Sequence, residues 1–171
     1  MSHDTHHHHK ESFITKYIFS QDHKMIARQY LITAIFMGAI GIALSALFRL
    51  KLGWPDDKFP ILESILGSDA APDGLLDSNW YLGLVTLHGT IMVFFVLTGG
   101  LSGTFSNLLI PLQVGARDMA SGLLNMISYW LFFLSSVLMA SSLFIETGPA
   151  MAGWTVYPPL SVLAEFQPGS S

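Results

Sequence analysis

Residues 80–110 read WYLGLVTLHGTIMVFFVLTGGLSGTFSNLLI, and this stretch decides the fold because it contains no Asp, Glu, Lys or Arg. A helix rises about 1.5 Å per residue, so about 20 apolar residues cross the hydrocarbon core of a bilayer. Trp80 and Tyr81 at its start are typical of the membrane–water interface. We therefore predict a transmembrane helix over residues 80–110.

Two further apolar stretches have the length of a membrane span. Residues 30–48 carry no charge and predict a helix over 26–48, and the uncharged interval that follows Asp118 predicts a third helix over 119–145. Small residues recur four apart, as in Ala34 and Gly38 or Gly99 and Gly103, which allows helix backbones to pack closely in lipid. The sequence predicts an all-α transmembrane bundle, with three spanning helices that belong to a larger one.

The remaining segments are polar. Residues 1–25 form a histidine-rich tail, which is either simply solvated or binds metal. Residues 49–79 form an acidic loop with a short helix near 61–66, and residues 146–171 form a second loop interrupted by proline and glycine.

The distribution of lysine and arginine gives an orientation. Basic residues favour the cytoplasmic side of a membrane. The tail and the turn between the second and third spans hold more of them than the acidic loop: Lys10, Lys16, Lys24, Arg28 and Arg117 against Arg49, Lys51 and Lys58. We place the N-terminus in the cytoplasm, and residues 49–79 and 146–171 on the opposite side of the membrane.

The composition excludes several classes of function. The chain has no cysteine, so it holds no disulfide, thiolate zinc site or iron–sulfur cluster. Its basic residues form no stripe, so binding to nucleic acid has no support.

His88 lies about 12 Å along the second predicted helix from Trp80 and therefore inside the hydrocarbon. An ionisable group at this depth is a functional candidate. One interpretation is a ligand of haem iron, because neutral imidazole suits that metal and costs less to bury than a charge. The alternative is a neutral imidazole that only bonds to a neighbouring helix.

Arg49 ends the first span on the side of the membrane where the second span begins. Beside a porphyrin it would donate to a ring substituent or propionate and raise the haem potential. Otherwise it is an interfacial arginine that extends its charge to water.

Asp118 lies in the turn before the third span, between Asn107 and Asn125 in the sequence. Asn125, Ser128 and Ser135 share one face of the third predicted helix, and such a stripe can hold a file of water. The alternatives are a solvated carboxylate in a turn and small polar residues that bond helices together.

Several motifs, in order, resemble subunit I of haem–copper terminal oxidases of the cytochrome c oxidase type. They are DHK at 22–24 with Ile26 and YLI at 30–32, FRL at 48–50, TLHGTIMVFF at 86–95, GARDMA at 115–120 and GWTVYPPL at 153–160. The resemblance covers residues from about 20 to 160, the N-terminal portion of that subunit with its first three transmembrane helices.

The resemblance implies the reduction of dioxygen to water with proton pumping. It makes His88 an axial ligand of the low-spin haem, expected to be haem A, with Arg49 beside it, and it makes Asp118 the entrance of a proton channel with Asn107, Asn125 and Ser128. The family's subunit has about twelve spans, and none of the ligands of its copper and high-spin haem lies in this chain. No residue here is therefore catalytic in itself.

The same resemblance implies partners: the remaining helices of subunit I, the other oxidase subunits, membrane lipids and cytochrome c or a complex containing it. A quinol oxidase of the same superfamily and a non-catalytic three-helix membrane subunit are the alternatives. One departure concerns Lys51, because many members carry there an acid that helps to bind a structural calcium or sodium ion.

Overall fold

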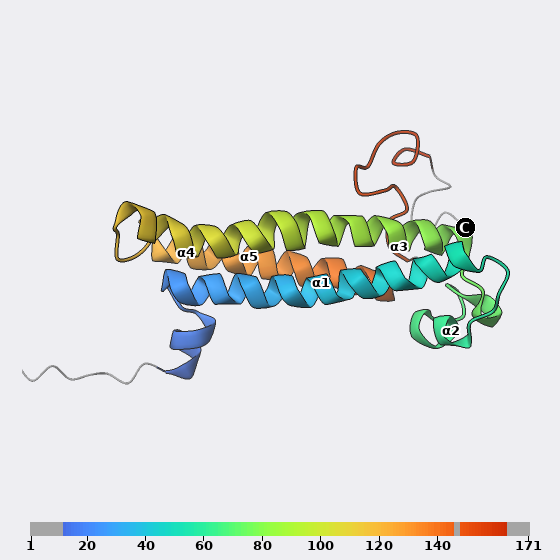
Figure 1. Ribbon diagram of the computed structural model, residues 1–171, viewed down its shortest axis with the longest axis horizontal. Coiled ribbons are helices and arrows are strands. Elements are labelled where there is room, and N and C mark those ends of the chain that lie inside the picture. The colour runs from blue at the N-terminus through green and yellow to red at the C-terminus, as the bar shows by residue number, and fades with distance from the viewer. Residues whose placement is uncertain (1–11, 146–147, 164–171) are drawn as a thin grey trace, which may run out of the picture.

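The computed structural model describes residues 12–145 and 148–163, and within these ranges the chain forms helices and connecting loops without a strand. Three long helical rods lie side by side, and a small helix packs at one end of them (Figure 1). The helical segments are η1 (Ile14–Ile18), α1 (His23–Gly53), α2 (Pro60–Leu66), η2 (Pro72–Gly74), α3 (Ser78–Thr90), η3 (Ile91–Leu101), α4 (Ser102–Val114), α5 (Gly122–Ser141) and η4 (Ser142–Phe144).

All three rods are long and apolar enough to cross a membrane: His23–Gly53, Ser78–Val114 and Gly122–Phe144. The predicted all-α transmembrane bundle is confirmed, and the chain is a multi-pass membrane protein. The predicted histidine-rich tail up to residue 11, and the last eight residues of the predicted final loop, lie outside the described residues.

The first rod, α1, is longer than its apolar stretch. It begins at His23 because the Asp22 carboxylate accepts a hydrogen bond from the Met25 N–H at 3.2 Å, the geometry of an N-cap. It continues to Gly53, where the Trp54 N–H bonds to the Leu50 carbonyl. The additional turns at both ends contain polar residues, which can extend a spanning helix into the headgroup region. Hydropathy alone therefore predicts a helix that is too short.

The second rod joins α3, η3 and α4 without a break. Asp77 caps its start by accepting from the N–H groups of Asn79 and Trp80, at 2.8 and 3.3 Å. The rod runs past Pro111 to Val114, where Gly115 ends it with a φ of 70°, a left-handed conformation that favours glycine. It therefore extends beyond the predicted 80–110 at both ends.

Residues Ile91–Leu101 in the middle of this rod are π-helical, so their backbone bonds skip one more residue than those of an α-helix. Segments of this kind are rare and recur at functional sites. Here the segment separates His88 from Asn107, which are the two polar residues of the rod that the sequence singled out.

Glycines let α1 and the second rod approach each other closely. Gly100 faces Ala34, and a Cβ added to Gly100 would overlap the Cβ of Ala34. A Cβ added to Gly103 would lie 2.6 Å from the ring of Tyr30. Backbone contact of this kind is what holds helices together in lipid, where burial of apolar surface gives little net gain.

The core lies where α1, the second rod and the loop between them meet, and α2 folds this loop over one end of the rods (Figure 1). The buried hydrophobic residues of this cluster are Met37, Leu44, Leu62, Ala71, Leu76, Leu84, Leu87, Ile91 and Phe95. In α5 most apolar side chains are exposed, for example Leu131 and Leu138 at 61% and 62%. That helix therefore presents its outer face to lipid or to other helices.

We predict that Gly100→Ala destabilises the bundle because the new methyl group collides with Ala34. Overpacking of this kind costs about 1–3 kcal/mol, so the thermal unfolding midpoint of the protein in detergent falls. Gly53→Ala is the matched control, because a Cβ there meets nothing within 4 Å. Equal midpoints for the two variants would contradict the contact.

Candidate functional site

His88 lies in the last turn of α3, and its ring is held by α1. The Nδ1 atom is 2.8 Å from the carbonyl oxygen of Gly41. A carbonyl only accepts hydrogen bonds, so Nδ1 carries a proton and donates it, and in a neutral imidazole the lone pair then lies on Nε2. A neutral imidazole whose second nitrogen is fixed by a carbonyl is the form in which histidine binds a metal.

Two neighbours complete the setting of the His88 ring. Phe48 of α1 contacts it edge to face, with ring centroids 5.5 Å apart. Gly41 allows the backbone of α1 to come close, because a Cβ there would lie 2.8 Å from the sulfur of Met92. The imidazole is thus held in position by α1, and no hydrogen bond to its Nε2 is recorded among the described residues, so these residues fit a haem ligand.

Arg49 follows Phe48 on α1 and is exposed. Among the described residues it forms no hydrogen bond or ion pair, so all of its guanidinium donors are available to a ligand. Arg49 lies about two helical turns beyond Gly41 on α1, whose carbonyl holds His88, and no contact between the Arg49 and His88 side chains is recorded among the described residues.

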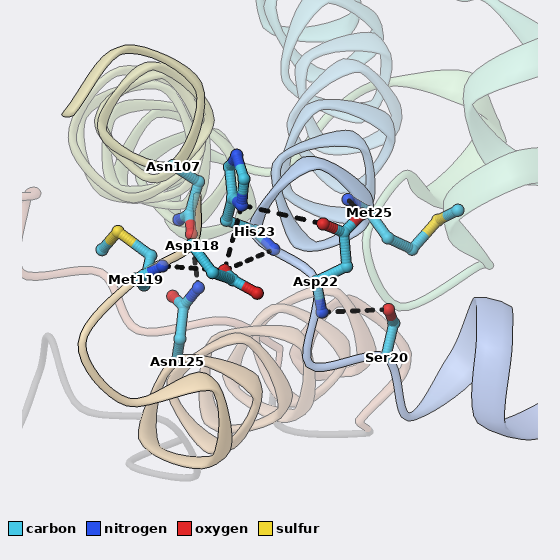
Figure 2. A network of polar contacts seen from close by, with 8 residues as sticks. All are labelled: Ser20, Asp22, His23, Met25, Asn107, Asp118, Met119 and Asn125. Atoms are coloured by element: carbon cyan, nitrogen blue, oxygen red, sulfur yellow. Dashed lines mark hydrogen bonds and ion pairs between the residues drawn. The ribbon is translucent and has the colours of Figure 1, made fainter. Parts of the chain in front are cut away.

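Asp118 lies at the opposite end, in the turn between α4 and α5, and it binds the start of α1 (Figure 2). Its Oδ1 atom accepts from the Met119 N–H at 2.7 Å and from the His23 N–H at 3.4 Å, and it lies 3.0 Å from His23 Nδ1. His23 is only 3% exposed, so the carboxylate has a buried partner although it is itself exposed.

These contacts set the charge of Asp118. Partial burial acts to raise the pKa of its carboxyl, but the hydrogen bonds from the Met119 N–H and from His23 outweigh this effect. The pKa of Asp118 therefore lies below the ordinary value for aspartate, and the side chain is ionised at neutral pH.

Asn107 and Asn125 meet directly at this end of the bundle. The amide of Asn125 donates to the side-chain oxygen of Asn107, whose own amide donates to the Gly103 carbonyl at 2.8 Å. Asn107 is 3% exposed, so the pair joins α4 to α5 on the inside of the bundle. Figure 2 shows the pair beside the turn that holds Asp118.

The serines further along α5 are placed differently. Ser128 and Ser135 are both exposed, and the Ser135 hydroxyl donates to the Leu131 carbonyl of its own helix at 2.8 Å. Among the described residues, the structure records no hydrogen bond between Ser128 and the asparagine pair. Ser128 is therefore open to lipid or to helices outside this chain, whereas Ser135 lines a pocket between α5 and the second rod with Thr90 and Phe94.

Sequence reasoning missed the contact of His23 with Asp118. The two residues are 95 positions apart, so no local spacing could reveal it. One feature of the sequence could have suggested this contact. Asp22 is a typical helix N-cap, and the helix start that follows it places free N–H groups and His23 at one end of the first span, where a carboxylate can bind. With Asp22 the pair places three possible metal-ligand atoms within 4.8 Å of one another.

Comparison with known proteins places the chain in a family. The family model described as "Cytochrome C and Quinol oxidase polypeptide I" matches residues 25–170. The alternative cytochrome c oxidase subunit 1 of Bradyrhizobium diazoefficiens is 44% identical over 156 residues, which cover 91% of this chain and 24% of that protein.

Two other relatives match most of this chain. The cytochrome c oxidase subunit 1 of Thermostichus vulcanus is 40% identical over 148 residues, 86% of this chain and 23% of that protein. A probable quinol oxidase subunit 1 of Staphylococcus aureus is 38% identical over 159 residues, 90% of this chain and 21% of that protein.

The three membrane-spanning helices and these matches define a helical membrane protein of the terminal-oxidase subunit I class. The chain belongs to the cytochrome c and quinol oxidase polypeptide I family, as its motifs indicated. It spans about a quarter of the length of the curated relatives it matches.

We predict that His23→Ala raises the pKa of the Asp118 carboxyl, because the variant loses a side-chain hydrogen bond that favours the ionised form. Infrared titration of the carboxyl C=O stretch in the purified protein measures the shift, with Asp118→Asn to assign the band. Gln21→Ala, an exposed neighbour, is the control. An unchanged Asp118 titration in His23→Ala would contradict the role of this contact.

Proposed function

We propose that this chain is part of the catalytic subunit of a proton-pumping haem–copper oxidase that reduces dioxygen to water. In this proposal His88 is one axial ligand of the low-spin haem, and Asp118 opens a proton channel. The observation that carries it is the hydrogen bond from His88 Nδ1 to the Gly41 carbonyl, which leaves Nε2 free for iron.

The haem, expected to be haem A, would supply reversible one-electron transfer when bound. The residues of this chain would hold and tune it. The Gly41 carbonyl fixes the orientation of the His88 ring, and Phe48 packs against one edge of that ring. Arg49, exposed and without a partner among the described residues, would donate to a haem substituent and raise the potential by its positive charge.

The proton-channel role is supported by the end of the bundle around Asp118. An ionised carboxylate in an aqueous turn can accept protons from the solvent, and its bond to His23 fixes its position. Asn107 and Asn125 offer amide groups inside the bundle that can order water beyond it. Ser128 would continue this file only against further helices, because it is exposed here.

The rest of the activity would come from outside this chain. No histidine follows His88 in this sequence, so the remaining helices of subunit I would ligate the high-spin haem and copper. The other partners would be the remaining oxidase subunits, membrane lipids and cytochrome c or a complex containing it. We assign the protein to the cytoplasmic membrane of a bacterium, with its N-terminus and Asp118 on the cytoplasmic side.

Quinol is the second candidate for the electron donor, because a quinol oxidase subunit 1 is among the relatives. A pyridine haemochrome spectrum of the purified complex identifies the haem type. Turnover with reduced cytochrome c and with quinol, measured on the same sample, distinguishes the two donors.

We predict that His88→Ala in the intact complex abolishes the low-spin haem band of the reduced-minus-oxidised spectrum, because the iron loses a ligand. Ser102→Ala, an exposed change on the same rod, leaves the band unchanged. Immunoblotting normalises the spectra to the amount of subunit. A full low-spin band in His88→Ala would refute the assignment and favour a non-catalytic helical subunit.

We predict that Asp118→Asn lowers turnover by about 10²-fold, the lower end of the contribution of a positioned proton-transfer group, and abolishes pumping. Both haem spectra remain intact, because Asp118 lies in the turn after α4 and the whole of η3 and α4 separates it from His88 in α3. Asp57→Asn, an exposed carboxylate in the acidic loop, is the control. Turnover and pumping equal to wild type would remove the channel assignment.

A further inference from the structure

A lysine in the last turn of α1 bonds to the chain that follows the helix. The ammonium of Lys51 donates a hydrogen bond to the carbonyl of Pro55 at 3.1 Å, across the turn in which the helix stops. The last carbonyl groups of a helix carry a partial negative charge, so a cation in the last turn is stabilising. Lys51 is half-buried, whereas Asp56 and Asp57 after it are exposed.

The resemblance to the oxidase family implies a calcium or sodium ion here, held in part by an acid at the position of Lys51. These ions take oxygen ligands, with carboxylates among the strongest. Lys51 removes that ligand, adds a positive charge and engages the Pro55 carbonyl oxygen. The residues of this chain therefore do not fit the ion.

We propose that the Lys51 ammonium replaces the structural metal ion as the cation that ties the end of α1 to the acidic loop. This contact matters for stability because the folded loop between α1 and α3 contributes buried residues to the core. Leu62 and Leu76 are 1% exposed in the core, and the Phe59 N–H bonds to the Gly74 carbonyl at 2.8 Å. The position of Pro55 sets where this folded loop begins.

The proposal is independent of the haem and proton-channel assignments, because it concerns only the charge at the end of α1. It predicts that the wild-type complex, washed with a chelator, keeps its thermal unfolding midpoint and gains none when millimolar Ca²⁺ or Na⁺ is added. Equilibrium dialysis with radioactive Ca²⁺ detects no specific binding to this subunit. A chelator-sensitive midpoint restored by Ca²⁺, or specific binding, would overturn the proposal.

Lys51→Glu tests the position directly, because it replaces the ammonium by a carboxylate beside the same carbonyl oxygen. We expect specific Ca²⁺ binding to appear, at least about tenfold above the non-specific background of wild type, and the midpoint to become Ca²⁺-dependent. Lys58→Glu makes the same charge change in the same loop, at a side chain that pairs with Asp73 at 3.3 Å. No gain in Lys51→Glu, or an equal gain in Lys58→Glu, would overturn the proposal.

Two further variants cover the case in which Lys51→Glu fails to accumulate. Lys51→Arg keeps a cation in the last turn. We expect the thermal unfolding midpoint of this variant, and the protease resistance of its loop, to stay near wild type. Lys51→Gln removes the charge, and both fall. Equal stability and protease resistance in Lys51→Gln and wild type would show that no cation is needed there.

Discussion

The close approach of α1 to the second rod is the constraint on which the rest of the structure depends. In lipid this approach rests on van der Waals contact, and it is possible only because Gly41, Gly100 and Gly103 present bare backbone. One result is that the Gly41 carbonyl reaches His88. At the other end the start of α1 reaches the turn between α4 and α5, where His23 meets Asp118.

The same helix therefore supplies a partner to both polar centres, which lie at opposite ends of the bundle. At one end α1 contributes a carbonyl group that fixes the tautomer of a histidine, and at the other it contributes a histidine that holds a carboxylate. Both partners sit on a long rigid helix, so neither centre depends on the acidic loop for its geometry. This arrangement keeps the half-buried imidazole of His88 and the exposed carboxylate of Asp118 in fixed positions.

Much of this could be predicted from the sequence. Stretches without charge predict three spans because hydrocarbon excludes ions, and the same argument makes His88 stand out. The contact between His23 and Asp118 could not be predicted, because it depends on how two distant turns meet. The stripe of Asn125 and Ser128 was predicted to share one face, yet Asn125 pairs inward with Asn107 while Ser128 is exposed. Helical periodicity predicts which residues share a face of a helix, but it does not predict which of them contact a neighbouring helix and which are exposed.

The π-helical turns at Ile91–Leu101 determine how the two ends of the second rod are rotated relative to each other. An α-helix rotates by about 100° per residue, so a single deletion in this stretch would turn everything after it by roughly that angle. Asn107 would then leave Asn125, although its own surroundings in the sequence were unchanged. The segment therefore sets the angle about the helix axis between the face that carries His88 and the face that carries Asn107. One residue inserted there would likewise turn Asn107 away from Asn125, while His88 would keep its place against Gly41.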